Sequence, residues 1–268
     1  MKNDSLGDRI KFYESSTTQT RLLHTIPIIC RLDGCSFHTF TKGLKRPYDE
    51  RLSKCMIETT KYLCKLTNAK IGYTQSDEIT LVLNSDKFES KVYFDSKLFK
   101  ISSVLASKCS VYFNQMIQQE IPEKARLLPV FDCRVFNVPS KEEAVNVLIW
   151  REQDATRNSI SMAAQSLYSH RELQKKSSNE MQELIFQKGI NWNDYPSFFK
   201  RGTYIQKKCT ESSLASDLIG LPEKHNARLN PDLSIKRTSY EEVDMPPILK
   251  IVNRVNFVFN NETMREQE

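Results

Sequence analysis

The chain is 268 residues long, with 39% hydrophobic residues, 27% charged residues and a formal net charge of +6. This composition is typical of a soluble globular protein with one large domain, or with a domain and an extension. No apolar run approaches the roughly 18 residues that a membrane-spanning helix needs, so we expect no membrane contact. The small positive excess is compatible with a polyanionic partner, but many unrelated proteins share it.

The N-terminal segment and the cysteines bear on the cellular compartment. Residues 1–14 carry three acidic side chains and no apolar region, which argues against a secretory signal and against a mitochondrial presequence. The seven cysteines form no CxxC pair, and most lie in apolar runs, so we expect free thiols rather than zinc ligands. Free thiols indicate that the protein is located in a reducing compartment. We expect the cytoplasm, with the mitochondrion as the alternative.

The first predicted element is a buried strand that ends in a carboxylate. An apolar, β-branched run from Ile26 to Leu32 leads directly into Asp33 and Gly34. This pattern is typical of a strand that delivers its acid to the edge of a sheet. Gly34 permits a tight turn and a close approach of the backbone to a ligand.

The elements that follow alternate between helix and strand. Apolar residues at steps of three and four, short β-branched runs and polar turns predict them. They are a helix from about Asp49 that stops near Asn68, strands at 70–73 and 79–83 joined by a turn with Asp77 and Glu78, a helix at 93–119, and a strand at 130–138.

This order of elements is that of the ferredoxin-like, or split βαβ, unit. In an antiparallel sheet of this topology the first and third strands are neighbours. Asp33 and Asp77, 44 positions apart in the sequence, would then lie close together at one edge of the sheet. This is the layout of a polymerase palm, so we predict an α+β fold with a palm-like domain and a helical second part.

Beyond Pro139 the pattern predicts mainly helices and then loses its periodicity. The expected elements are helical stretches at 142–148, 157–168 and 179–187, a strand or loop at 198–205, and a last strand at 248–259. We divide the chain into a palm-like catalytic domain (1–140), a helical part that completes it (141–206) and a partly irregular C-terminal extension (207–268). The extension is polar and contains prolines, which favours partial disorder.

Asp33, Asp77 and Glu78 are the candidate catalytic acids. Carboxylates that meet at one sheet edge can hold two Mg²⁺ ions against nucleotide phosphates, with water completing each ion's shell. The alternative is that they are solvated turn acids, as an isolated Asp-Gly pair usually is. Because two acidic sites converge, the pattern favours metal-binding acids and solvated turn acids about equally.

Two basic segments could contact phosphate groups. The loop after the first acid supplies backbone amides and cations that suit a triphosphate, although an ordinary basic surface loop would look the same. Lys200 and Arg201 lie between aromatic residues, which suggests an RNA contact, and a solvent-facing pair is about as plausible. Asp132 and Arg134 could support the acids, with a structural ion pair as the default. The loop's polar and basic residues are Ser36, His38, Lys42, Lys45 and Arg46.

Five stretches of the chain together form a recognisable set: RLDGCSFH (31–38), QSDE (75–78), PVFDCRV (129–135), WREQD (150–154) and KRGT (200–203). Taken together, these stretches resemble the tRNA-histidine guanylyltransferase family and its guanylyltransferase-like relatives, the 3′–5′ RNA polymerases. The resemblance implies a palm-like catalytic domain with a helical second part, assembled as a homotetramer. It further implies two Mg²⁺ ions, GTP and ATP as substrates, and tRNA as the partner.

The resemblance also assigns roles to individual residues. It implies that Asp33, Asp77 and the Gly34 carbonyl bind the metal, with Glu78 beside them. Backbone amides of the run Gly34, Cys35, Ser36, Phe37 and His38 would cradle the triphosphate, and Arg46, Asp49 and Ser76 would lie near the nucleotide. Apart from these implied roles, we expect Asn158, Lys200 and Arg201 to contact RNA.

The implied reaction is attack by a nucleotide 3′-hydroxyl on an activated RNA 5′ end, with release of pyrophosphate or AMP. One departure from the family pattern matters for the substrate. Where the histidine-tRNA enzymes carry a histidine after WREQD, this chain has Thr156, and only Asn158 matches the following run; a later lysine is also replaced, around Ser178. This favours template-dependent repair of truncated tRNA 5′ ends. The alternatives are addition of G−1 to histidine tRNA and an inactive tRNA-binding subunit, against which the clustered acids argue.

Overall fold

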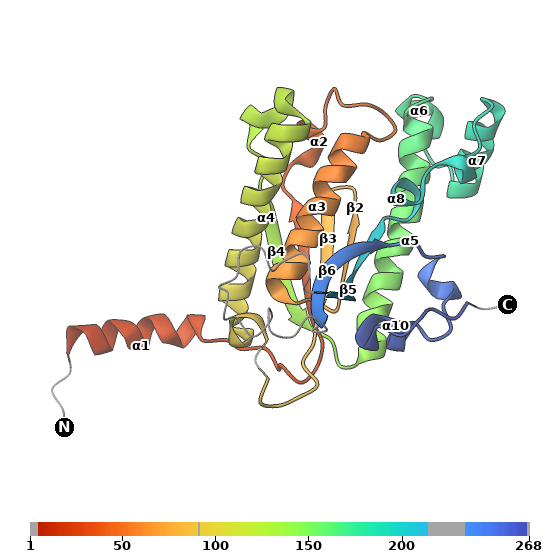
Figure 1. Ribbon diagram of the computed structural model, residues 1–268. Helices are drawn as coiled ribbons and strands as arrows, with labels where there is room; N and C mark the ends of the chain where they lie inside the picture. Colours follow the sequence, from red (N-terminus) through yellow and green to blue (C-terminus); the bar gives the residue numbers. More distant parts are fainter. Residues whose placement is uncertain (1–4, 91, 214–233, 267–268) are drawn as a thin grey trace.

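A six-stranded antiparallel sheet forms the centre of the molecule, with the strand order β4-β1-β3-β2-β5-β6 (Figure 1). The computed structural model describes residues 5–90, 92–213 and 234–266. The strands are β1 (Ile28–Gly34), β2 (Ile71–Gln75), β3 (Glu78–Leu83), β4 (Phe131–Asn137), β5 (Thr203–Ser213) and β6 (Ser234–Val243). The predicted α+β class is confirmed, and β1 lies beside β3 as the palm topology requires.

Helices cover both faces of this sheet (Figure 1). α3 and α4 pack with β1 and β3 around one core, and α5 and α10 pack on the opposite face. The 13-residue helix α1 buries none of its residues and projects away from the body. The α-helices are α1 (Leu6–Thr18), α2 (Phe37–Phe40), α3 (Glu50–Thr67), α4 (Leu98–Glu120), α5 (Lys141–Gln165), α6 (His170–Leu173), α7 (Ser178–Gln187), α8 (Ser197–Lys200) and α10 (Arg254–Asn260). Short 3₁₀ turns are η1 (Tyr93–Ser96), η2 (Pro122–Leu127), η3 (Trp192–Asp194) and η6 (Ile248–Lys250).

The alternation of side chains along β1 explains how one strand serves both layers. Ile28, Cys30 and Leu32 are fully buried against α3 and α4, whereas Ile29 is buried in the core under α5. Successive side chains of a strand point to opposite faces, so Arg31 and Asp33 lie on the α5 side. The acid at the end of β1 is therefore directed toward α5.

Helix α3 begins and ends where the sequence predicts. The Asp49 side chain accepts a hydrogen bond from the Arg51 N–H and caps the first turn. Asn68 ends the helix in the left-handed conformation with a φ of 53°, which asparagine adopts more readily than most residues.

The structure differs from the prediction in the second half of the chain. Residues 141–165 form one continuous helix, without the expected break around 149–156. The predicted last strand at 248–259 is wrong, because this segment forms η6 and α10. A short apolar run such as 257–259 is compatible with a strand or a helix. Here the segment forms a helix that packs on α5.

The segment beyond residue 207 contains more regular structure than expected. β6 pairs with β5 over ten residue pairs, from Tyr204↔Val243 to Ser213↔Ser234. The described outer runs of this hairpin, KKCT (207–210) and KRTS (236–239), are mostly polar in sequence, so they lack the apolar–polar alternation that indicates a half-buried strand. The rest of the expected irregular stretch, 214–233, lies outside the described residues, and the three-part division of the chain stays a prediction. Within the described part, no helix has the length and apolarity needed to span a bilayer.

Candidate active site

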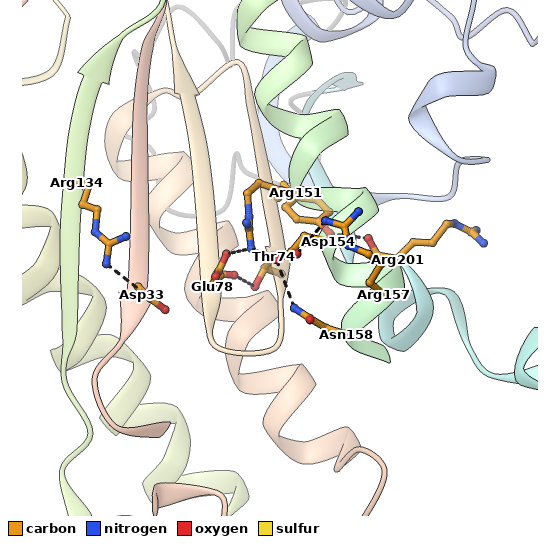
Figure 2. A network of polar contacts seen from close by, with 10 residues as sticks. Asp33, Thr74, Glu78, Arg134, Arg151, Asp154, Arg157, Asn158 and Arg201 are labelled. Atoms are coloured by element: carbon orange, nitrogen blue, oxygen red, sulfur yellow. Dashed lines mark hydrogen bonds and ion pairs between the residues drawn. The ribbon is translucent and has the colours of Figure 1, made fainter. Parts of the chain in front are cut away.

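The predicted acids meet at one edge of the sheet. Asp33, near the end of β1, pairs with Glu78, the first residue of β3. The Gly34 N–H donates a hydrogen bond of 3.1 Å to the Asp77 carbonyl oxygen, which joins the two turns. On its other side Asp33 pairs with Asp132 of β4 and lies 3.4 Å from the Arg134 guanidinium (Figure 2).

The electrostatics of Asp77 fit a cation site. Burial raises the pKa of the Asp77 carboxyl, and the nearby negative charge of Asp33 raises it further. A divalent cation between the two acids would relieve both costs. Carboxylate oxygens are the ligands that Mg²⁺ prefers, and it usually takes only one or two of them, with phosphate and water completing its shell.

The third acid has a different environment. The Glu78 carboxylate forms an ion pair with Arg151 of α5, and its carbonyl oxygen accepts a 2.9 Å hydrogen bond from Thr74 Oγ1 (Figure 2). Burial raises the pKa of Glu78, while Arg151 and Arg31 oppose that rise. Among the described residues, no three His, Cys, Asp or Glu side chains are arranged to hold a metal ion.

A cavity of about 740 Å³ opens beside these acids. Gly34, Ser76 and Asp77 form its acidic end, and the basic loop after β1 forms one wall. Seven of the predicted nucleotide-binding residues line it, namely Gly34, Ser36, Phe37, His38, Arg46, Asp49 and Ser76. A cavity of this size, with cations at one side and carboxylates at its end, suits a nucleoside triphosphate.

Comparisons with known proteins identify the family. A family model described as tRNAHis guanylyltransferase matches residues 7–139. The tRNA(His) guanylyltransferase of Saccharomyces cerevisiae is 30% identical, over 78% of this chain and 92% of that protein. The chain belongs to the tRNAHis guanylyltransferase family.

Solved structures extend the likeness to most of the chain. A bacterial tRNA(His) guanylyltransferase-like protein in complex with ATP has a TM-score of 0.79 and 35% identity, over 95% of this chain and 99% of that one. The Saccharomyces cerevisiae enzyme has a TM-score of 0.65 and 28% identity, over 75% of this chain and 92% of that one. Members of this guanylyltransferase family are nucleotidyltransferases, so the predicted family and enzyme class are confirmed.

The backbone at the acidic end is tightly constrained. A Cβ atom on Gly34 would lie 2.3 Å from the Phe37 ring, so only glycine fits between Asp33 and this buried aromatic residue. Ser36 and Ser76 both have a left-handed φ, of 56° and 54°. These two turns bring the loop after β1 and the β2–β3 hairpin to the same end of the cavity.

Two of the five amides expected to cradle phosphate are already engaged. The Gly34 N–H binds the Asp77 carbonyl, and the Cys35 N–H donates 2.9 Å to the Val130 carbonyl. Cys35 is exposed and does not line the cavity. A phosphate cradle in this chain would therefore start at the Ser36 amide.

Asp49, one of the predicted nucleotide-binding residues, has a structural role. The Asp49 carboxylate is buried and accepts hydrogen bonds from Arg51, whose guanidinium lowers the pKa of Asp49. Asp49 thus shapes the cavity wall with its charge already paired. Sequence reasoning missed Met162 and Gln165, which line the cavity from α5; they lie beyond the WREQD motif, and no pattern marks them.

The three predicted RNA contacts lie away from the cavity wall. The Lys200 ammonium group donates to the Asn193 carbonyl and lies 5.7 Å from the Trp192 ring centroid. Arg201 lies 3.3 Å from Ser197 Oγ, and Asn158 donates 3.4 Å to Asp154 on the same helix. Their contact with RNA stays a prediction, and Lys200 would have to give up its internal partners to make one.

Proposed function

We propose that this guanylyltransferase-family protein adds nucleotides in the 3′–5′ direction to the 5′ ends of truncated tRNAs, copying the opposing base. The observation that carries the proposal is the cavity that Asp77, Gly34 and the cationic loop after β1 line together, with Asp33 directly before Gly34 on β1. Related structures are described as complexes with ATP and with GTP, which supports both as substrates here.

The residues of the site divide the work of phosphoryl transfer. Asp33 and Asp77 would hold two Mg²⁺ ions, which supply charge neutralisation and activation of the attacking hydroxyl. Lys42, Lys45 and Arg46, which also line the cavity, would neutralise and orient the triphosphate. Its apolar lining residues, Leu44, Tyr48, Leu52 and Met162, would take the base.

Two observations favour truncated tRNA over histidine tRNA as the substrate: the residue at position 156 of α5, and the likeness to the bacterial guanylyltransferase-like structure. Thr156 takes the place of the family histidine, and its hydroxyl donates 2.9 Å to the Glu152 carbonyl of its own helix. The guanylyltransferase-like bacterial structure also covers more of this chain than the yeast enzyme does. The second candidate is G−1 addition, favoured by the curated relatives named tRNA(His) guanylyltransferase.

Assembly and location are further proposals. A homotetramer rests on the family resemblance. A cytoplasmic location rests on the cysteines, all seven of which are free thiols.

The test compares two kinds of tRNA. A tRNA that lacks its first 5′ nucleotide, with a 5′-monophosphate or a 5′-triphosphate, is incubated with labelled nucleotides beside a full-length histidine tRNA. We expect addition to the truncated tRNA. Addition of G to full-length histidine tRNA alone would identify the second candidate, and binding without any addition would identify an inactive subunit.

A further inference from the structure

One buried arginine joins the acidic turn to the long helix α5. The Arg151 side chain is 6% exposed, and its Nη2 contacts Oε2 of Glu78, the residue after Asp77. The same nitrogen lies 3.1 Å from Oδ2 of Asp154, one turn further along the helix. Figure 2 shows Arg151 reaching from α5 to the start of β3.

The Arg151 guanidinium is held on several sides. Its central carbon lies 4.6 Å from the ring centroid of Trp150, and the Arg31 guanidinium lies 5.5 Å from the same ring. A guanidinium whose Nη2 meets two carboxylates beside an indole ring is restricted in its orientation, because these contacts must be made together. Arg151 therefore acts as an anchor between two elements, unlike a solvated surface cation.

The anchor acts on the residue next to a proposed metal ligand. Glu78 is held at its carboxylate by Arg151 and at its carbonyl by Thr74. Asp77 directly precedes Glu78 in the chain, and its own carbonyl oxygen accepts the hydrogen bond from the Gly34 N–H. A shift of Glu78 would consequently change the position of Asp77 relative to Asp33.

We propose that Arg151 is a positioning residue, which acts through Glu78 to set the geometry of the Asp33–Asp77 cation site. Glu78 is then the contact point of the anchor and does not bind the ion itself. The same helix lines the nucleotide cavity at Met162 and Gln165, so the anchor also sets this wall relative to the acids. The inference rests on the proposed function for the role of the ions.

The test measures binding of Mn²⁺ alone, followed by electron paramagnetic resonance, because Mn²⁺ takes the same oxygen ligands as Mg²⁺. Arg151→Lys keeps the charge and loses the planar fork. We expect Mn²⁺ affinity to fall about 10- to 100-fold, the usual effect of removing a group that orients a metal ligand. In the nucleotide-addition assay kcat should fall while KM for GTP changes by less than about twofold.

A matched control and a double variant sharpen the result. Lys141 joins the other end of α5 to Asp86, beyond the end of β3, at 2.6 Å. Lys141→Gln removes an ion pair next to the same two elements and should leave Mn²⁺ affinity unchanged. Glu78→Gln should match Arg151→Lys, and the double variant should lose no more than either single one, because both remove one contact.

Several outcomes would overturn the inference. They are wild-type Mn²⁺ affinity in Arg151→Lys, additive losses in the double variant, and tighter Mn²⁺ binding in Arg151→Lys, which would mean that a freed Glu78 binds the metal. If Arg151→Lys does not fold, Glu78→Gln tests the same contact from the hairpin. If the wild type adds no nucleotide to any tRNA while Arg151→Lys still weakens Mn²⁺ binding, the proposed function fails and the positioning role stands.

Discussion

Asp77 carries two unfavourable features that a folded protein usually avoids. Asp77 is half-buried, and its carboxyl lies close to the like charge of Asp33. Both features raise the pKa of Asp77, which means that the ionised form costs stability in the metal-free protein. This arrangement is explained if a cation normally sits between the two acids.

The isosteric change Asp77→Asn tests this explanation. Without divalent ions, the variant should be more stable than the wild type by about 1 kcal/mol, because a repelled and buried charge is gone. Its nucleotide addition should fall by about 100-fold or more, since a metal ligand is lost. Thermal unfolding with and without Mg²⁺ and an addition assay check this. Undiminished addition by Asp77→Asn would remove the metal assignment.

The sequence could predict these acids because their signal is local. A carboxylate after a β-branched run and a second acidic turn 44 positions later are visible without the fold. Arg151 could not be assigned to Glu78 in the same way. Its partner lies 73 positions earlier in the chain, and only the packing of α5 on the sheet brings the two together.

At the scale of elements, Gly202 sets the start of β5. It has a φ of +83°, and a Cβ atom there would lie 2.6 Å from the Thr74 carbonyl oxygen and 2.6 Å from the Tyr73 hydroxyl. The Tyr73 hydroxyl donates 2.7 Å to the Arg201 carbonyl at the same place. The glycine of the KRGT motif is thus required by the close approach of β5 to β2.

Gly202→Ala should destabilise the protein by about 2 kcal/mol or more, because backbone strain and a clash with main chain add together. Gly189→Ala is the matched control. Gly189 also has a positive φ, of +78°, but nothing within 4 Å of the added Cβ, so strain alone should cost about 1 kcal/mol. Urea unfolding of both variants gives the two values. Equal losses would show that the Thr74 and Tyr73 contacts play no part.

A second buried carboxylate ties α5 to β5 and to the C-terminal segment. Glu152 accepts a 2.9 Å hydrogen bond from the Tyr204 hydroxyl and a 3.1 Å bond from the Ile248 N–H. Burial raises the pKa of Glu152 despite these donors. The folded protein therefore binds a proton at Glu152 more readily than the unfolded chain does.

The sign of the pH dependence follows from that shift. The contribution of Glu152 to stability is complete below the ordinary glutamate pKa and is lost as the pH rises through the raised value. A glutamine side chain in its place does not titrate. The stability of Glu152→Gln relative to the wild type should thus increase between about pH 5 and pH 8, as measured by urea unfolding across that range. A difference that does not change with pH would contradict the raised pKa.

The elements show where sequence patterns suffice and where they do not. The palm strands and α3 follow from alternation, helical periodicity and the Asp49 and Asn68 caps. α10 and the outer part of the β5–β6 hairpin could not be predicted. The first is a short apolar run, and the second is mostly polar in sequence at 207–210 and 236–239, so neither has a period that identifies it.

At the scale of the whole molecule, the sheet and α5 together build one site. β1 and β3 bring the acids to one edge, the loop after β1 adds the cations, and α5 adds the anchor at Arg151 and the far wall at Met162. Asp77, the loop after β1 and Met162 line one cavity of about 740 Å³. We propose that this site copies a template base.

The most direct measurement varies that base. A tRNA without its first 5′ nucleotide is prepared in four forms that differ only in the base opposite the gap. Each form carries a 5′-triphosphate and is offered all four nucleoside triphosphates. We predict that the added nucleotide is the Watson–Crick complement of the opposing base in all four cases. Addition of G whatever the opposing base, or addition to none of them, would contradict the account.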